Sequence, residues 1–167
     1  MKTFKFSSQK FYTVFKGSIL ASVSLVLLLI TATAFRSQQD NPDAIVGVWK
    51  TGEGNAMVRI YKNGEKYQGK VVWLKEPTDP ETGKPKLDKF HPDESTRTRP
   101  ILGLINVWGF EYKEKNTWAE GNIYDPKNGN TYSCSMKLDK SNSLEVRGFI
   151  GVSLIGRTDT WTRQVAK

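Results

Sequence analysis

The chain has 167 residues, a formal net charge of +8, five tryptophans, one histidine and a single cysteine. The lone cysteine excludes a fold held together by internal disulfide bonds, and the length is sufficient for one hydrophobic core. Half of the net charge comes from four lysines near the N-terminus; the remaining 21 basic and 17 acidic residues form no dense basic stripe, which argues against nucleic-acid binding.

Residues 1–34 have the composition of an export signal. Four lysines precede an apolar run over residues 19–30, and Ala32-Thr33-Ala34 has the small residues that a signal peptidase accepts. An uncleaved membrane anchor is the alternative, because residues 17–35 are uncharged and about long enough to cross a bilayer. We therefore predict an exported protein, periplasmic or extracellular, with a short polar lead over residues 35–44 and one domain over residues 45–164. Any membrane association is expected only through an uncleaved signal.

The rest of the chain divides into short segments rich in Val, Ile, Tyr and Trp, separated by turn residues. Asn63-Gly64 and Asn128-Gly129 are typical of tight hairpins, so neighbouring segments are expected to pair antiparallel. Closing eight such strands into a barrel removes both exposed edges. The sequence thus predicts an all-β, eight-stranded antiparallel up-and-down barrel with strands at residues 45–50, 57–61, 67–74, 105–112, 117–124, 131–138, 143–149 and 156–163.

One connection, residues 75–100, is much longer than the others and contains five prolines. Loops of this length in small domains are usually functional or disordered. We expect it at one mouth of the barrel, where it forms either a lid with a helical turn or a plain excursion.

No residue pattern points to a particular enzymatic reaction. Asp88, His91 and Asp93 lie close together in the long loop, but one histidine and two carboxylates at these spacings match no metal motif, so no metal or cofactor is predicted. Glu120 would serve as a general acid only if it faced the interior, and an outward surface carboxylate is the favoured interpretation. Cys134 alternates with apolar residues and is interpreted as a small core residue.

The last predicted strand carries charges on the same face as its only large aromatic side chain. Arg157, Asp159, Trp161 and Arg163 share this face, since side chains alternate along a strand. Gly47-Val48-Trp49 opens the first strand. Together these features resemble the calycin-type barrels, the lipocalins and their relatives, in which an arginine of the last strand commonly lies across a first-strand tryptophan at the closed end.

This resemblance implies structural roles for both ends of the chain. Arg157 or Arg163 would cover Trp49, with the guanidinium over the indole face. Arg157 and Asp159 would pair at the closed end, because buried charges require partners. The alternative is that this charged face of the last strand binds a ligand.

Six segments in order also resemble the bacterial domain-of-unknown-function family 2147, small exported proteins with a lipocalin-like barrel: GVWKT, GKVVWL, RPILGL, GNIYDPKNGNTYSCSMKL, LEVRGFIG and GRTDTWTR. Membership implies the fold and the compartment but no established activity.

Our leading hypothesis is non-enzymatic binding of a small, partly apolar molecule in the barrel mouth, with Trp73, Trp108, Trp118 and Tyr132 as apolar walls. The alternative is an envelope interaction module that docks a protein or glycan and uses the barrel as a scaffold. A hydrolase with inward carboxylates ranks third. The oligomeric state is left open.

Overall fold

The computed structural model describes residues 40–152 and 154–165. The predicted signal, residues 1–34, and the lead up to residue 39 lie outside the described residues. Residues 40–167 form one compact unit. None of the helices in the described part of the chain has both the length and the apolar character needed to cross a membrane.

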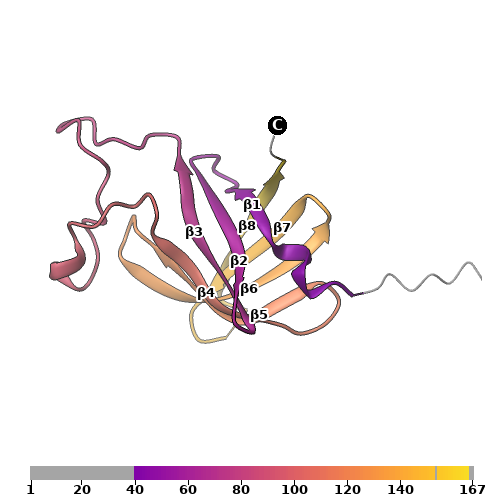
Figure 1. Cartoon of the computed structure of the whole chain (residues 1–167). Helices are drawn as coiled ribbons and strands as arrows, with labels where there is room; N and C mark the ends of the chain where they lie inside the picture. Colours follow the sequence, from indigo (N-terminus) through magenta and orange to yellow (C-terminus); the bar gives the residue numbers. More distant parts are fainter. Residues whose placement is uncertain (1–39, 153, 166–167) are drawn as a thin grey trace, which may run out of the picture. The chain divides into compact units, whose positions relative to one another are not determined.

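Eight antiparallel strands close into a barrel in which each strand pairs with its neighbours in sequence and β1 pairs with β8 (Figure 1). This confirms the predicted up-and-down barrel. The strands are β1 (Gly47–Lys50), β2 (Ala56–Asn63), β3 (Lys66–Leu74), β4 (Ile105–Tyr112), β5 (Thr117–Asp125), β6 (Asn130–Lys140), β7 (Ser143–Phe149) and β8 (Gly156–Gln164).

The start of the domain differs from the prediction. The first strand begins at Gly47 instead of Ile45, because Pro42–Ile45 form a 3-10 helix, η1. Asn41 caps η1 by accepting a hydrogen bond from the Asp43 backbone N–H at 3.0 Å, and Pro42 supplies a backbone angle suited to a first turn. Ile45 is completely buried, so its apolar side chain serves the core from a helix and not from a strand.

The long connection between β3 and β4 projects beyond the ends of these strands (Figure 1). It contains a short helical turn, η2 (Glu94–Thr96), which was one of the two alternatives for this segment; Asp93 caps it by accepting from the Ser95 backbone N–H at 2.9 Å. Two isolated bridges, Thr78 with Pro85 and Leu87 with Pro100, fold the connection back on itself.

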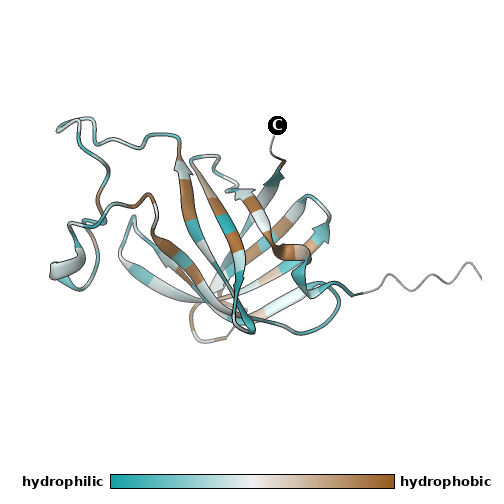
Figure 2. Ribbon diagram, in the orientation of Figure 1, coloured by the Kyte–Doolittle hydropathy of each residue, from teal (hydrophilic) through white to brown (hydrophobic). Residues whose placement is uncertain are grey.

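The barrel interior is filled by large apolar side chains at one end. Brown and teal alternate along β2 and β3 in Figure 2, as expected for strands with one face inside. Three tryptophans are 2% exposed or less. The ring of Trp118 meets those of Tyr67 and Tyr112 edge-on, at centroid distances of 6.4 and 5.4 Å. The buried core cluster comprises Ile45, Trp49, Val58, Ile60, Tyr67, Val107, Phe110, Trp118, Cys134, Met136, Leu138, Leu144, Val146 and Trp161.

Glycine within the strands makes room for this packing. A Cβ on Gly121 would lie 2.4 Å from the ring of Phe110, and one on Gly69 would lie 2.7 Å from Val107. Both positions therefore need a residue without a side chain, because a contact this short cannot form without displacing a core ring or branched side chain.

Candidate functional site

The two ends of the barrel differ in chemistry. We call the end with the connections β1–β2, β3–β4, β5–β6 and β7–β8 the mouth, and the end with η1 the closed end. Strands of seven to eleven residues separate the ends along most of the wall. Side chains on one face of one strand can therefore lie at opposite ends of the barrel.

At the closed end, Arg163 lies over Trp49, with the guanidinium carbon 4.1 Å from the ring centroid. The guanidinium also donates hydrogen bonds to three backbone carbonyls: Nη1 to Val46 at 2.9 Å, Nε to Ser141 at 2.6 Å, and Nη2 to Ala44. Burial lowers the pKa of Arg163 from its ordinary value. This arginine joins the start of β1, η1 and the β6–β7 turn, as the family resemblance implied for one of the two arginines.

The helix η1 completes the closed end. Tyr67 Oη donates to Asp43 Oδ1 at 2.6 Å, and Trp118 Nε1 donates to the Pro42 carbonyl at 3.1 Å. Trp49 Nε1 donates to the Ile45 carbonyl at 2.8 Å. Burial and the bond to Asp43 raise the pKa of Tyr67 to about 12. The polar atoms of these three aromatic side chains thus donate hydrogen bonds to η1 and hold it against the barrel.

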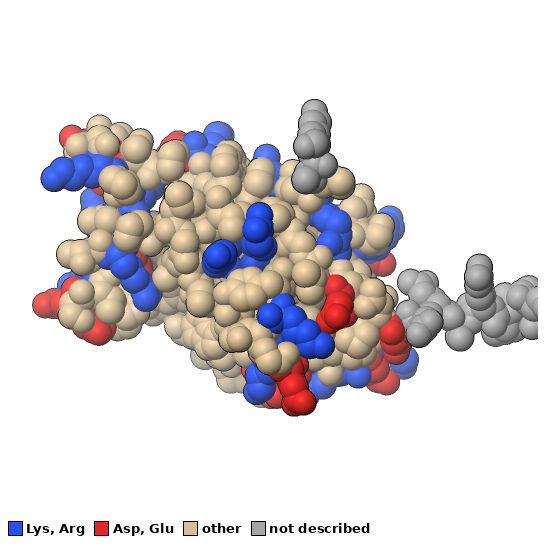
Figure 3. All heavy atoms as spheres, in the orientation of Figure 1, with Lys and Arg blue, Asp and Glu red and all other residues tan. Residues whose placement is uncertain are grey.

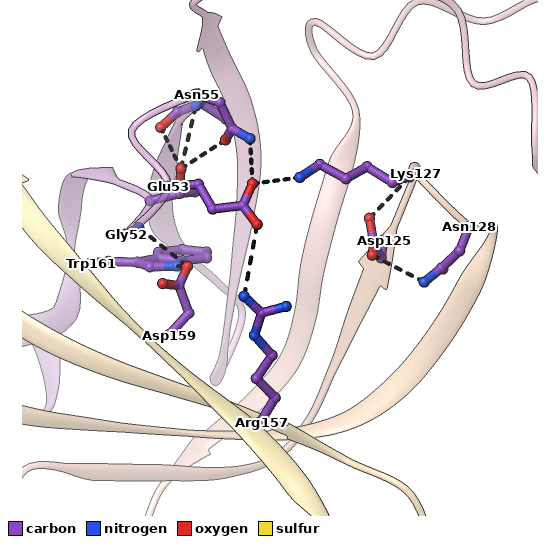
Figure 4. Close-up of polar contacts among 11 residues, drawn as sticks. Gly52, Glu53, Asn55, Asp125, Lys127, Asn128, Arg157, Asp159 and Trp161 are labelled. Carbon is purple, nitrogen blue, oxygen red and sulfur yellow. Dashed lines mark hydrogen bonds and ion pairs between the residues drawn. The ribbon is translucent and has the colours of Figure 1, made fainter.

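Arg157 lies at the mouth and not beside Trp49. Its side chain is 87% exposed, and Nη2 lies 4.0 Å from Glu53 Oε1. Glu53 also accepts a hydrogen bond from Lys127 Nζ, and this bond and the positive charge of Lys127 lower the pKa of Glu53. Figure 4 shows Glu53 between the two cations. We call Glu53, Lys127 and Arg157 the mouth ion-pair cluster.

This cluster spans the mouth. Glu53 belongs to the β1–β2 connection and Lys127 to the β5–β6 connection. In a closed ring of eight strands in sequence order these hairpins stand opposite one another. The pair of Glu53 and Lys127 therefore links opposite walls, which no pattern of strand alternation predicts.

Asp159 points inward but does not pair with Arg157 as predicted. Its Oδ2 accepts from the Gly52 backbone N–H at 3.2 Å and from Trp161 Nε1 at 2.8 Å (Figure 4). A Cβ on Gly52 would lie 2.0 Å from Asp159 Oδ1, so only glycine fits there. Asp159 thus fixes the β1–β2 connection that carries Glu53. Arg157 and Asp159 lie in the first half of β8, near the mouth, and each has other partners there, whereas Arg163 lies near the end of the strand at the closed end.

Below the cluster, inward-facing residues near the mouth are less buried than those of the closed end. Ile123 pairs with Tyr132, and both are only half-buried. A Cβ on Gly148 would contact both side chains, at 3.4 and 3.7 Å, so Gly148 lies on the same inner wall. Asn128 Nδ2 donates to Tyr132 Oη at 3.1 Å. The mouth therefore presents an aliphatic and an aromatic surface beneath polar groups.

The long connection is anchored to the outside of β5 through Asp88, which is completely buried. Tyr124 Oη donates to Asp88 Oδ1 at 2.6 Å, while Arg99 donates to Oδ2 through Nε at 3.0 Å and Nη2 at 2.8 Å. Burial and the bond to Asp88 raise the pKa of Tyr124 to about 12. Since every oxygen of Asp88 has a partner, this cluster acts as a structural anchor beside the mouth.

The loop residues weighed for metal binding have other partners. His91 Nδ1 accepts from the Asp93 backbone N–H at 3.0 Å, and Asp93 caps η2. Across the described residues, no three His, Cys, Asp or Glu side chains gather closely enough to hold a metal ion. Glu120 has a positive φ of 60° and a side chain that is 67% exposed, with Lys113 Nζ 3.9 Å away, so it does not face the interior.

The four aromatic residues predicted as ligand walls do not form one surface. Tyr132 faces the mouth, whereas Trp118 faces inward at the closed end and is fully buried. A register shift between β2 and β3 places Trp73 opposite Met57 on the outer face, where Lys50 Nζ lies 5.9 Å from its ring. Trp108 pairs with Asn122 on the outer face of β4 and β5. The bulge thus turns Trp73 outward, whereas Trp108 follows the inward-facing Val107 and lies on the opposite face by ordinary alternation.

The mouth residues Glu53 and Lys127 were not predicted from the sequence. Both lie in turns, where hydrophobic periodicity carries no information about direction. The Asn-Gly pair of the β5–β6 turn was the only signal near Lys127, and it indicates a hairpin without indicating what the hairpin contacts.

Two surface hollows are lined by residues other than the mouth ion-pair cluster and the inner wall. One of about 360 Å³ lies beside η1 and is lined by Pro42, Lys62 and Tyr112 among others. The other, of about 430 Å³, lies at the base of the long connection and is lined by Pro100, Leu102 and Ile105 among others. Both are shallow. Neither brings together the groups of the mouth.

Comparisons with known proteins agree with this architecture. Residues 47–163 match the model of a family described as "Uncharacterized protein conserved in bacteria (DUF2147)". A solved structure, protein HP1028 from the human pathogen Helicobacter pylori, described as belonging to the lipocalin family, superimposes with a TM-score of 0.63. It is 21% identical, and the match covers 72% of this chain and 83% of that chain. The comparison with curated proteins found no match.

Proposed function

The chain belongs to the DUF2147 family of bacterial proteins and folds as a lipocalin-like barrel, and from this premise we propose that it binds a small, partly apolar molecule at the barrel mouth. The ligand contacts the inner wall formed by Ile123, Tyr132 and Gly148. The mouth ion-pair cluster lies across the entrance.

The observation that carries the proposal is the contrast between the two ends of the interior. At the closed end, Trp49 and Trp118 have no exposed surface, and η1 and Arg163 seal the barrel. At the mouth, Ile123 and Tyr132 remain half-buried although they face inward. Small-molecule sites combine such apolar walls with a few polar groups that fix orientation.

The mouth ion-pair cluster is suited to opening. Its side chains are well exposed: 47% for Glu53, 63% for Lys127 and 87% for Arg157. Ion pairs this exposed contribute only about 0–1 kcal/mol. Separating Glu53 from Lys127 therefore costs little, and the inner wall beneath it becomes accessible without disturbing the packed core.

A binding assay with matched variants tests the proposal. Gly148→Leu fills the inner wall beside Ile123 and Tyr132, and we expect it to weaken binding of an apolar fluorescent probe by tenfold or more. Ser133→Leu adds the same side chain to the outer face of β6 and serves as the control. Circular dichroism establishes that both variants fold. Equal probe binding by folded Gly148→Leu and the wild type would refute the proposal.

Native mass spectrometry of the purified protein gives a second test without a chosen probe. A reproducible excess mass that denaturation removes supports a carried ligand. A clean protein mass together with a co-purifying protein contradicts it and favours the interaction module instead.

We also propose that the protein works outside the cytoplasm, in the periplasm or beyond it. The support is the composition of residues 1–34, with basic residues, an apolar run and small residues at the end. N-terminal sequencing of the protein purified from its host is expected to begin at Phe35. A chain that begins at Met1 and fractionates with membranes would show an anchor instead.

A further inference from the structure

The β7–β8 connection carries a cluster of exposed aliphatic side chains. The exposed fractions are 69% for Ile150, 61% for Val152, 89% for Leu154 and 70% for Ile155. In Figure 2 this connection is coloured brown, below the strands, and in Figure 3 the same region is tan. Single exposed apolar residues are normal on protein surfaces, but four in one short connection indicate a surface that meets a partner.

The backbone of this connection turns the side chains away from the barrel. Gly151 has a φ of +68°, which favours glycine. The Ile155 backbone N–H donates to the Val152 carbonyl at 3.1 Å, and the Ile150 N–H donates to the Ile155 carbonyl at 3.3 Å. These bonds close a turn beyond the strand ends. We call residues 150–152 with 154–155 the apolar tip.

The charged residues that flank the apolar tip on its own two strands are both basic, although Arg157 also lies 4.0 Å from Glu53 of the β1–β2 connection. Arg147 on β7 and Arg157 on β8 flank it, and the sequence between them contains no acidic residue. Arg147 Nη1 donates to Thr158 Oγ1 at 3.0 Å, which holds it beside the tip. The side chain of Arg157 is 87% exposed. An aliphatic surface bordered by cations matches the interface of a bilayer, where acyl chains lie beneath anionic headgroups.

We propose that the apolar tip inserts into the surface of an anionic phospholipid bilayer, with Arg147 and Arg157 near the phosphate groups. Because the tip belongs to the mouth end, the barrel mouth then faces the membrane. Arg157 also belongs to the mouth ion-pair cluster, but the exposed aliphatic side chains of the tip do not, so variants of Leu154 and Ile155 test the proposal without changing the groups proposed to contact a ligand.

A lipid surface fits this feature better than a second copy of the chain. Stable protein interfaces bury about 1,200–2,000 Å² in total, far more than a turn with four exposed side chains supplies. A two-fold contact between tips would also bring Arg147 and Arg157 of both copies together, because such a contact repeats the same surface on each side. Anionic headgroups supply the opposite charge.

Vesicle binding by the predicted mature chain, residues 35–167, tests the proposal. This chain includes the whole compact unit Asp40–Lys167 and omits the N-terminal apolar run. Vesicles of phosphatidylglycerol and phosphatidylcholine are compared with vesicles of phosphatidylcholine alone by flotation. We expect stronger binding to the anionic vesicles and a decrease as salt is raised, because salt screens the attraction of arginines to headgroups.

The decisive variant is Leu154→Ser combined with Ile155→Ser, which we expect to lower partitioning into anionic vesicles by tenfold or more. Val165→Ser is the matched control, since Val165 is 84% exposed at the other end of the barrel, and its partitioning should stay within twofold of the wild type. Arg157→Gln should lower partitioning by about fivefold, because a basic residue near an anionic surface contributes about 1 kcal/mol.

Three outcomes would overturn the proposal. The first is that the wild-type chain does not bind anionic vesicles. The second is that the double variant partitions like Val165→Ser although thermal melting shows that both variants are folded. In the third, sedimentation shows a dimer that the double variant abolishes, so that the tip binds a second copy instead of lipid.

Discussion

Replacing Arg163 with alanine should destabilise the barrel, whereas the same replacement of Arg157 should not. The two arginines lie on the same face of β8, six positions apart. Arg163 covers Trp49 and donates to three backbone carbonyls at the closed end. Arg157 has one ion pair, at 4.0 Å, and an 87% exposed side chain. Because both variants replace arginine with alanine on the same face of β8, a difference in stability between them reports the position of the arginine along the strand.

The expected magnitudes follow from these contacts. Hydrogen bonds from a charged donor contribute about 1.5–3 kcal/mol each, and the guanidinium over Trp49 adds about 0.5–2 kcal/mol. Arg163 is only partly buried, so water replaces some of the lost donors, and we expect a net loss of about 3 kcal/mol for Arg163→Ala. For Arg157→Ala we expect about 0–1 kcal/mol, since exposed ion pairs stabilise little.

Urea denaturation followed by far-ultraviolet circular dichroism measures the loss of unfolding free energy in both variants. We expect the slope of the unfolding free energy against urea concentration to be the same as in the wild type. Tryptophan fluorescence is the poorer signal, because Arg163 touches Trp49. Arg163→Lys should fall between wild type and Arg163→Ala, because an ammonium cannot reproduce the planar fork of donors. Equal destabilisation by Arg157→Ala and Arg163→Ala, or a loss below about 1 kcal/mol for Arg163→Ala, would refute this account of the closed end.

Three further predictions concern buried polar groups. Tyr124→Phe leaves Asp88 without one donor, so it should cost about 1–3 kcal/mol and speed proteolysis within the long connection while β-sheet circular dichroism is retained; unchanged proteolysis would contradict the anchor. Tyr67 and Tyr124 have pKa values raised to about 12, so their contribution to stability is complete below pH 10 and lost as the pH rises towards 12. Ultraviolet titration should show Tyr67 and Tyr124 ionising well above pH 10, and ionisation of every tyrosine near pH 10 would contradict it. Cys134 is 1% exposed and burial raises its pKa to about 12, so it should react with a thiol reagent at pH 8 only after unfolding; rapid labelling of the native protein would contradict this.

Strand positions and their antiparallel order could be predicted from the sequence. The alternation around Val58 and Ile60, and around Cys134 and Met136, matches the buried face, and the Asn-Gly turns lie where hairpins form. These features depend on neighbours in sequence, and local backbone geometry determines them. Closure of β8 on β1 follows from the same pattern, since eight paired strands leave two edges to satisfy.

Positions that depend on bulges or on strand length could not be predicted in this way. The sequence predicts Trp73 and Trp108 among the ligand walls, but both lie on the outer face. For Trp73 the reason is the register shift between β2 and β3, whereas Trp108 directly follows the inward-facing Val107 and so points the other way. Arg157 was grouped with Arg163, although six residues of β8 carry them to opposite ends. Alternation specifies a face, not a distance along the barrel axis.

The sequence by itself determined the strands, their pairing order and the polar inner face of the last strand, because each depends on local backbone preference and a period of two. Only the tertiary structure decided that Arg163 and not Arg157 covers Trp49, that Asp88 anchors the long connection, and that Glu53 meets Lys127 across the mouth. These contacts join residues between 11 and 114 positions apart. Their geometry is set by how the ring closes, which no short segment encodes.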